Sequence, residues 1–265
     1  MRMCSIASGS SGNCIYIGSD TTHLLVDVGI SGKKTAEGVE SLGIRMDELD
    51  GILITHEHND HVNGLGVLAR KYHIPIYATN GTIQAIKQMG SLGQIDDELF
   101  CPIWAQDKFT VKDISVRSIR ISHDAAEPVA YKFASDGKKA AIMTDLGTYD
   151  DYIVDNLRGM DALLLEANHD VHMLEVGPYP YYLKRRILGN HGHLCNEASG
   201  RLLSSVLHDN MKAVVLGHLS KENNMPELAY EAVRLEITNS DTPYRADDFK
   251  IMVAKRSERS EVIEF

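Results

Sequence analysis

The stretch Thr55-His56-Glu57-His58-Asn59-Asp60-His61 directly follows the apolar run Gly51-Ile52-Leu53-Ile54. Within six residues it holds four side chains that commonly ligate metals: His56, His58, Asp60 and His61. A strand that ends in such a cluster places imidazoles and a carboxylate at the rim of a sheet, where a loop can wrap them around cations without burying unpaired polar groups. The stretch therefore predicts a metal site.

Three later residues with the same chemistry also stand directly after strand-like runs: His123, Asp145 and His218. The seven side chains form a nitrogen and oxygen donor set that suits Zn²⁺, Mn²⁺ or Fe, and not the oxygen-only cages of Ca²⁺. A single metal ion could not use all seven side chains as ligands. Two divalent metal ions about 3.5 to 4 Å apart, bridged by a carboxylate and a water, would use all of them and lower that water's pKa towards neutrality.

Composition narrows the class of protein. The chain has 265 residues, 43% of them apolar, which is enough for a substantial core, and a formal net charge of -10. That charge argues against a protein that binds nucleic acid through the electrostatic attraction of its net charge, although a local basic patch or bound cations can still attract phosphates. The N-terminus lacks a secretory signal and no run is long enough for a membrane span, so we expect a soluble cytoplasmic protein with no membrane partner.

The order of elements predicts a mixed α/β fold. Strand-like runs at residues 3–7, 14–17, 23–28 and 51–55 are interpreted as a meander, with helical spacing at 33–42 and again at 63–72. Strands and helices then continue to the C-terminal end. No Pro/Gly/Ser-rich linker divides the chain, so a single domain over residues 1–265 is predicted. The four cysteines show no CxxC pair and are expected to be reduced thiols.

The HxHxDH loop followed by a His, an Asp and a final His resembles the metallo-β-lactamase fold superfamily over nearly the whole chain. The resemblance implies a four-layer αβ/βα sandwich. It implies that one metal ion is bound by His56, His58 and His123, and the other by Asp60, His61 and His218, with Asp145 bridging the two. Asp27 matches the superfamily's early aspartate that braces the metal loop, although a turn-forming Asp before Gly29 is the alternative.

Further blocks at residues 7–13, 165–170, 192–196 and 217–223 are together similar to the YycJ/WalJ-type proteins. That resemblance implies a phosphodiesterase related to the tRNA 3′-processing nucleases and described as a 5′ to 3′ DNA exonuclease. The chain departs from the family's GHLSN pattern because Cys195 stands at the Ser position. A hydrogen bond from that hydroxyl would be weakened.

Two residues outside the metal ligands carry a catalytic prediction. The resemblance implies that Glu166 and His193 form a pair that donates a proton to the leaving oxygen, since a phosphodiester oxyanion leaves poorly unless it is protonated or bound to metal. Asp60 is expected to orient the attacking hydroxide as well as to ligate. The alternative for His193 is a structural residue before the helix that begins near Asn196.

Substrate contacts are predicted at three places. The Gly/Ser turn with Ser8, Ser10 and Asn13 suits close approach to a phosphate, or is only a turn between strands. Aromatics interleave with cations around Lys184, Arg185 and Arg186, a composition that suits DNA or a charged helix face. The remaining candidates are Asn168, His169 and Lys221, the last beside the final ligand. His169 could contact substrate or metal, or His169-Asp170 could be a solvated turn.

The leading hypothesis is a metal-dependent hydrolase, a nuclease acting on DNA, in which a metal-bridging hydroxide attacks phosphorus. A thioester or lactone hydrolase on the same metals is the first alternative, and a non-catalytic regulatory protein that retains the fold is the second. The complete ligand set argues against the latter, because unneeded ligands gather costly polar groups at one point. β-Lactam hydrolysis is disfavoured, since the chain shows no export signal and keeps Asp60 and His61.

Overall fold

The computed structural model describes residues 1–265, which form two compact units. The first unit comprises Met1–Arg120, Ala125–Gly137 and Lys255–Glu264, and the second comprises Ile121–Asp124, Lys138–Ala254 and Phe265. A single domain over residues 1–265 remains a prediction.

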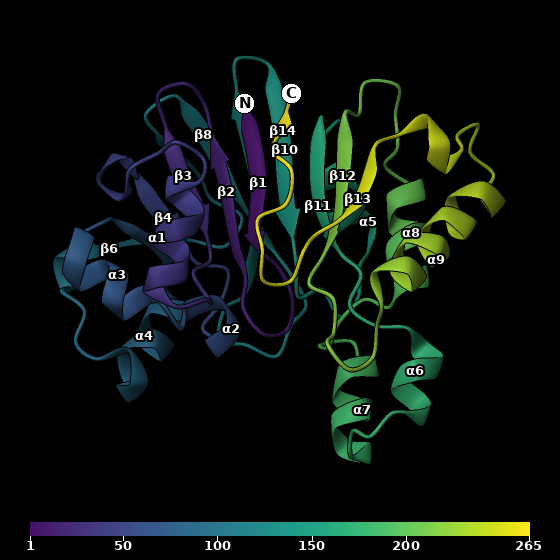
Figure 1. The fold of residues 1–265 in the computed structure, drawn as a ribbon, viewed down its shortest axis with the longest axis horizontal. Helices are drawn as coiled ribbons and strands as arrows, with labels where there is room; N and C mark the ends of the chain where they lie inside the picture. Colours follow the sequence, from purple (N-terminus) through teal and green to yellow (C-terminus); the bar gives the residue numbers. More distant parts are fainter. The chain divides into compact units, whose positions relative to one another are not determined.

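The first unit is built around a seven-stranded sheet with the order β14-β1-β2-β3-β4-β5-β6 (Figure 1). Its strands are β1 (Arg2–Ala7), β2 (Cys14–Gly18), β3 (His23–Val26), β4 (Gly51–Leu53), β5 (Ile76–Thr79), β6 (Phe100–Ile103) and β14 (Ile263–Glu264). Strands β1 to β3 are antiparallel neighbours, whereas β3 to β6 run parallel. The predicted meander is therefore wrong at its fourth strand: the intervening helix carries the chain back, so β4 starts from the same end as β3.

Helices cover this sheet along one flank in Figure 1, namely α1 (Gly32–Glu40), α3 (Leu65–Tyr72) and α4 (Asn80–Gln88). Their apolar stripes pack on the sheet through residues such as Val39, Leu68 and Ile83, which share one core with Leu25 and Ile52. The helix predicted at residues 63–72 is confirmed as α3, which begins two residues later, and a separate short helix, α2 (Asn59–Val62), precedes it. Short 3₁₀ turns occupy Met46–Glu48, Gly90–Leu92 and Asp97–Leu99.

An antiparallel group of three strands completes the first unit: β7 (Lys108–Val111), β8 (Ile114–Arg120) and β9 (Val129–Ser135). The tight turn after β7 positions Asp113, whose carboxylate accepts hydrogen bonds from the hydroxyls of Ser19 and Thr22. These hydrogen bonds, the one from Thr22 foremost, hold the pKa of Asp113 far below its usual range. The turn is thereby fastened to the loop between β2 and β3.

The second unit contains four parallel strands in the order β10-β11-β12-β13. They are β10 (Lys138–Met143), β11 (Ala162–Glu166), β12 (Ala213–Gly217) and β13 (Ile251–Val253). Strands β11 and β12 are buried along their whole length, which explains why their sequences are continuous apolar runs and not alternating ones. Because the strands are parallel, the residues that follow β10, β11 and β12 lie at one edge of the sheet.

Five helices belong to the second unit: α5 (Asp151–Leu157), α6 (Val171–Val176), α7 (Tyr181–Leu188), α8 (Asn196–Ser204) and α9 (Pro226–Asn239). A 3₁₀ turn at Ala246–Asp248 precedes β13. Helices α8 and α9 lie side by side next to β12 and β13, and α6 and α7 lie together beyond the strand ends (Figure 1). No helix of the chain has both the length and the apolar character needed to cross a membrane.

Candidate metal centre

The loop that follows β4 in the first unit carries His56, His58, Asp60 and His61. The side chains of His56 and His61 are fully buried, whereas His58 and Asp60 are partly exposed. His58 is the residue before α2, and Asp60 and His61 lie within that single helical turn. A one-turn helix thus packs three potential ligands into four consecutive residues.

Asp27, at the end of β3, holds this loop in place. Its carboxylate accepts hydrogen bonds from the Thr55 amide at 2.9 Å, from the Thr55 hydroxyl at 2.8 Å and from His61 Nδ1 at 2.7 Å. An imidazole that donates its Nδ1 proton to a carboxylate keeps Nε2 unprotonated, and an unprotonated Nε2 can accept a hydrogen bond or bind a cation. Asp27 thus holds the loop through Thr55 and His61, and its role in bracing a metal-binding loop stays a prediction. The sequence did not single out Thr55 as a contact of Asp27.

Asn13 contacts the same loop from the turn between β1 and β2. Its side-chain nitrogen lies 3.2 Å from His61 Nε2 and 3.3 Å from the carbonyl oxygen of Asp60, and its oxygen accepts from the Gly9 amide. Both Asn13 and Ser8 are buried, so within this turn only Ser10 and Ser11 are exposed. Asn13 therefore supports the loop, and its predicted contact with substrate stays a prediction together with those of Ser8 and Ser10.

We expect Asp27→Asn to lower metal affinity about 10- to 100-fold while the chain remains folded. Asp27 has φ 59°, a left-handed conformation that Asn tolerates better than most residues. The amide nitrogen of the new Asn, however, can donate a hydrogen bond to His61 Nδ1. This favours the tautomer that carries its proton on Nε2, and a protonated Nε2 cannot bind a metal ion. Metal titration followed by inductively coupled plasma mass spectrometry checks this, with circular dichroism as the folding control. Wild-type affinity in a folded Asp27→Asn protein would contradict the bracing role.

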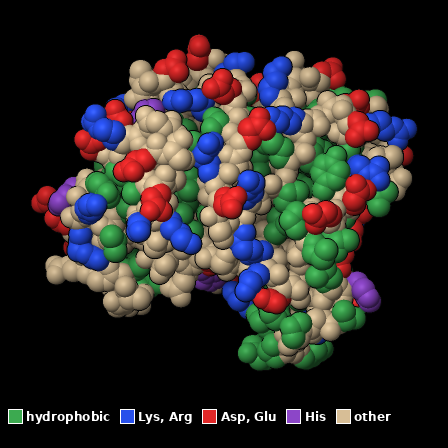
Figure 2. Space-filling view, in the orientation of Figure 1, with side chains coloured by type: hydrophobic (Ala, Val, Ile, Leu, Met, Phe, Trp, Pro, Cys, Tyr) green, Lys and Arg blue, Asp and Glu red, His purple; other side chains and the backbone are tan.

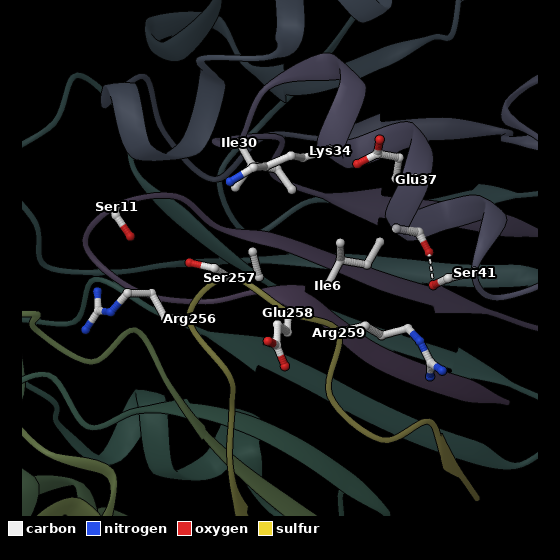
Figure 3. A pocket seen from close by; sticks show the side chains of 12 residues that line it. Ile6, Ser11, Ile30, Lys34, Glu37, Ser41, Arg256, Ser257, Glu258 and Arg259 are labelled. Atoms are coloured by element: carbon white, nitrogen blue, oxygen red, sulfur yellow. Dashed lines mark hydrogen bonds between the residues drawn. The ribbon is translucent and has the colours of Figure 1, made fainter.

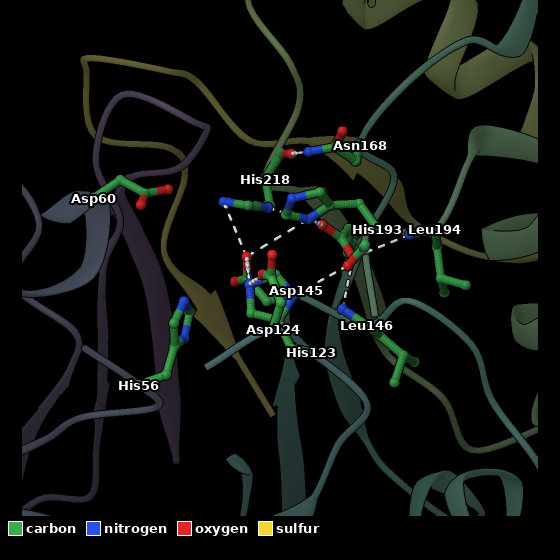
Figure 4. A network of polar contacts seen from close by, with 12 residues as sticks. His56, Asp60, His123, Asp124, Asp145, Leu146, Asn168, His193, Leu194 and His218 are labelled. Carbon is green, nitrogen blue, oxygen red and sulfur yellow. Dashed lines mark hydrogen bonds and ion pairs between the residues drawn. The ribbon is translucent and has the colours of Figure 1, made fainter. Parts of the chain in front are cut away.

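In the second unit, Asp145 after β10 is the centre of a group of histidines (Figure 4). Its Oδ1 lies 3.6 Å from Nε2 of His123 and 3.6 Å from Nε2 of His218. His123 Nδ1 contacts the carbonyl oxygen of Gly192 at 3.1 Å, so that nitrogen is the donor and Nε2 carries the lone pair. Both imidazoles therefore turn the nitrogen that binds metals towards the same carboxylate.

Glu166, the last residue of β11, connects this group to His193. One carboxylate oxygen, Oε1, accepts from Nδ1 of His193 and from Nδ1 of His218, each at 2.8 Å. The other, Oε2, accepts from the amides of Leu146 and Leu194 (Figure 4). Burial alone would raise the pKa of Glu166, but the two imidazoles outweigh it and lower this pKa to about 2. Glu166 is thus an anion that orients a candidate ligand and the candidate proton donor together.

The backbone at three of these positions is unusual. Asp27, Asp145 and His218 follow β3, β10 and β12, and their φ angles are 59°, 58° and 55°. Residues other than glycine rarely adopt this region, and each such residue costs on the order of 1 kcal/mol or more. Strain of this kind persists where the surrounding structure fixes it and occurs most often at functional sites. Its occurrence after β3 in the first unit and after β10 and β12 in the second supports a functional role for these strand ends within each unit.

Asn168 and His169 lie in the interior of the second unit. Asn168 Nδ2 donates to the carbonyl oxygen of His218 at 2.9 Å, so Asn168 supports that strand end. His169 is 1% exposed, which excludes the solvated turn, and burial lowers its pKa to about 4. A contact of either residue with substrate remains a prediction.

The basic positions of α7 have partners within the protein. Lys184 Nζ donates to the carbonyl oxygen of Glu175, Arg186 forms an ion pair with Asp124, and Arg185 lies over the Tyr181 ring at 6.0 Å. Lys221 after β12 is exposed and lies 3.6 Å from Glu222. At the helix start that follows His193, Cys195 Sγ accepts from the Ala198 amide at 3.4 Å, so the thiol replaces a serine hydroxyl as the cap of α8.

Each unit offers side chains whose donor chemistry fits a divalent metal ion. In the second unit, Asp145, Glu166, His193 and His218 each offer a ligand atom within 4.8 Å of the others. His61, His123 and His218 all donate Nδ1 to an oxygen and present Nε2, the arrangement found in histidines that bind metals. Such a set of imidazoles and carboxylates is typical of a hydrolytic metal centre.

Fold and donor set together define a metallohydrolase-like protein, and comparison with known proteins makes this specific. Residues 22–219 match the model of the beta-lactamase superfamily domain, and the chain belongs to that family. It is 44% identical to "Exodeoxyribonuclease YycJ" of Bacillus anthracis over 86% of each chain. It is 41% identical to "Exodeoxyribonuclease WalJ" of Streptococcus pneumoniae over 93% of this chain and 91% of that protein.

The fold has a solved counterpart. The metallo-beta-lactamase fold protein YhfI of Bacillus subtilis matches 100% of this chain and 99% of its own, with a TM-score of 0.72 at 14% identity. The predicted four-layer αβ/βα sandwich is confirmed by this match. The family implies divalent metal ions, and the His/Asp residues described above are of the kind that binds them.

Proposed function

We propose that the chain is a binuclear metal-dependent phosphodiesterase, a 5′ to 3′ DNA exonuclease. The observation that carries the proposal is the Glu166 carboxylate, which binds Nδ1 of His193 and of His218 at 2.8 Å each. This single group couples a candidate metal ligand to a candidate proton donor. The names of the two curated relatives, both exodeoxyribonucleases that align over at least 86% of this chain, support DNA as the substrate.

The proposed ligand assignment uses residues from both units. His56, His58 and His123 would hold one ion and Asp60, His61 and His218 the other, with Asp145 shared between them. Zn²⁺, Mn²⁺ and Fe all suit this nitrogen and oxygen set. When bound, such ions lower the pKa of water towards neutrality and stabilise the negative charge that develops on a phosphate.

The chain's own residues supply the proton transfers in this proposal. His193 is 15% exposed at its side chain, and its Nδ1 is occupied by Glu166, so its Nε2 is the atom available to a leaving oxygen. The Glu166 carboxylate orients the imidazole through Nδ1, and Nε2 would carry the proton that passes to the leaving oxygen. Asp60, partly exposed beside the buried His61, would orient the attacking water.

One experiment separates this proposal from hydrolysis of a thioester or lactone. The metal-loaded protein should hydrolyse bis(p-nitrophenyl) phosphate, lose that activity with a chelator and regain it with Mn²⁺ or Zn²⁺. Glutathione thioesters and homoserine lactones should be left intact. Thioester or lactone hydrolysis without phosphodiester hydrolysis would overturn the phosphodiesterase.

For the DNA contacts, we propose α7. Tyr181 and Tyr182 are 76% and 74% exposed, and Arg185 lies over the Tyr181 ring. Figure 2 shows hydrophobic side chains gathered over α6 and α7. Exposed aromatic rings with a neighbouring cation suit the stacking of unpaired bases, which contributes about 1–3 kcal/mol per base. Lys184 and Arg186 would add phosphate contacts only by leaving their partners within the protein.

Neutralising Lys184, Arg185 and Arg186 to Gln should weaken DNA binding and flatten its dependence on salt, with most of the effect in Arg185→Gln alone. Each phosphate contact removed should reduce the slope of log K against log salt by about 1. Fluorescence anisotropy with labelled DNA at several salt concentrations measures this. Arg158→Gln, which removes an exposed and paired cation from α5's C-terminal end, is the control. An unchanged slope in the triple variant would exclude α7 as a contact.

A further inference from the structure

Three buried asparagines of the second unit are joined by hydrogen bonds: Asn168, Asn196 and Asn224. Each follows, within a few residues, one member of the group formed by Glu166, His193 and His218, in that order. The three asparagines are 3%, 0% and 6% exposed, so their side-chain amides are removed from water. A buried amide is costly unless it is hydrogen-bonded, so the partners of these amides indicate their role.

Asn224 is the centre of this group. Its Oδ1 accepts from the side chain of Asn196 at 3.0 Å and from the amide of Met225 at 2.9 Å. Its Nδ2 donates to Asn196 Oδ1 at 2.8 Å and to the carbonyl oxygens of Ala167 and Asn168 at 2.9 and 3.0 Å. Because a backbone amide can only donate and a carbonyl oxygen can only accept, these partners fix the orientation of the Asn224 side chain.

Asn168 connects the same segments through its backbone and its side chain. Its carbonyl oxygen accepts from the amide of Ser220 at 2.7 Å, and its amide donates to the carbonyl oxygen of Leu194 at 2.9 Å. Its side chain donates to the carbonyl oxygen of His218 at 2.9 Å (Figure 4). The segments that follow β11 and β12 and the segment that contains His193 are therefore bound to one another.

The contact between Glu166 and His193 depends on this arrangement. The two residues are 27 positions apart in the chain, and His193 Nδ1 lies 2.8 Å from Glu166 Oε1. A shift of the His193 segment by about 1 Å would stretch this contact beyond the usual hydrogen-bond limit of about 3.2 Å and turn Nε2 away from its target. A misplacement of that size can lower a reaction rate by about 10²-fold.

We propose that Asn168, Asn196 and Asn224 are positioning residues for the proton donor. They hold the His193 segment so that the imidazole stays hydrogen-bonded to Glu166 while its Nε2 meets the leaving oxygen. Fully bonded polar networks of this kind are rigid and specify one arrangement. Amides suit the task because they do not titrate, so their bonds persist when the imidazole gains or loses a proton. The inference rests on the proposed function and adds to it the residues that set the geometry of the acid.

The test uses two variants of the full chain that weaken the network to different degrees. Asn224→Ala removes every hydrogen bond of the central amide, whereas Asn196→Ala leaves the bonds from Asn224 to the backbone in place. Steady-state kinetics are measured on DNA and on thymidine 5′-p-nitrophenyl phosphate. Metal content and the unfolding midpoint are measured on the same preparations.

Two control variants each remove a side-chain donor to a backbone carbonyl oxygen outside the network. Asn156→Ala removes a buried asparagine of α5 whose side chain donates to the carbonyl oxygen of Tyr152 at 2.8 Å. Ser41→Ala acts in the first unit, in the groove between α1 and residues 256–259, where the hydroxyl donates to the carbonyl oxygen of Gly38 at 2.6 Å (Figure 3). The controls show what the loss of such a bond does by itself.

For Asn224→Ala we expect kcat on DNA to fall about tenfold to a hundredfold, with metal content and KM nearly unchanged. The nitrophenyl ester should be hydrolysed at close to the wild-type rate, because its leaving group needs little help from an acid. Asn196→Ala should show the same pattern to a smaller extent. Both controls should treat the two substrates alike. Adding Asn224→Ala to His193→Ala should cause no further loss on DNA, because residues that act as a unit are not additive.

A measurement that does not depend on catalysis is the downfield proton resonance of His193 Nδ1–H, assigned by its absence in His193→Ala. It should shift or broaden in Asn224→Ala and stay unchanged in the controls. Equal losses on the two substrates, additive losses with His193→Ala, or an unchanged resonance would overturn the proposal. Should Asn224→Ala not fold, the same comparisons on Asn196→Ala decide. If the wild type hydrolyses neither substrate, the proposed function fails, whereas the resonance still decides the positioning.

Discussion

Asp145→Asn should abolish metal binding and hydrolysis together. Asp145 Oδ1 lies 3.6 Å from Nε2 of both His123 and His218, and the carboxylate is almost completely buried. Exchanging it for a neutral amide removes the shared anionic ligand from the proposed centre. Since a bound metal ion contributes several kcal/mol to charge stabilisation in the transition state, we expect turnover to fall by about a thousandfold or more.

Asn is the informative substitution at this position. Asp145 has φ 58°, which Asn tolerates, whereas Ala would add backbone strain to the loss of the ligand. Metal content by mass spectrometry, thermal unfolding and DNA hydrolysis are measured on the same preparation. Asp145→Ala should show the same loss of metal with a lower unfolding midpoint. An Asp145→Asn protein that keeps two equivalents of metal and full activity would contradict the assignment.

His193→Ala should lose turnover but, unlike Asp145→Asn, retain metal. His193 contacts Glu166 at 2.8 Å and is more exposed than His123 or His218. Loss of a general acid typically costs about 10²- to 10⁴-fold in rate, and we expect this loss in kcat with little change in KM. Metal content and steady-state kinetics on DNA measure it.

The choice of leaving group separates proton donation from a purely structural role. A structural defect would slow hydrolysis of all substrates alike, whereas loss of a proton donor affects mainly those with a poor leaving group. A nitrophenolate needs little help from an acid, so His193→Ala should lose far less activity on thymidine 5′-p-nitrophenyl phosphate than on DNA. Equal losses on both substrates would indicate that His193 only positions other groups. Normal turnover on DNA would exclude the proton-donor role.

The positions of the candidate ligands could be read from the sequence because they follow strands. Asp145 stands after an apolar run that is β10, and His218 stands after one that is β12. Parallel strands place such residues at one edge of a sheet, so the grouping of Asp145 with His218 follows from the pattern of the chain. Resemblance to a known superfamily then added the pairing of Glu166 with His193.

Other features depend on tertiary contacts that no local pattern reports. The sharing of Glu166 between His193 and His218 requires segments separated by 27 and 52 residues to converge. The left-handed backbone at His218 runs against the preference of that residue type, so sequence alone favours the wrong conformation. The parallel direction of β4 also escaped prediction, because strand pairing is decided by the path of α1 and not by the residues of β4.

The most direct test is digestion of DNA and RNA, single- and double-stranded, with separate labels at the 5′ and 3′ ends and with Mn²⁺, Zn²⁺ or Fe²⁺ supplied in turn. We expect nucleotides to be released from the 5′ end of DNA in a reaction that depends on metal, stops with a chelator and is absent in Asp145→Asn. DNA left intact with every metal, while the same preparation binds metal and is folded, would contradict it.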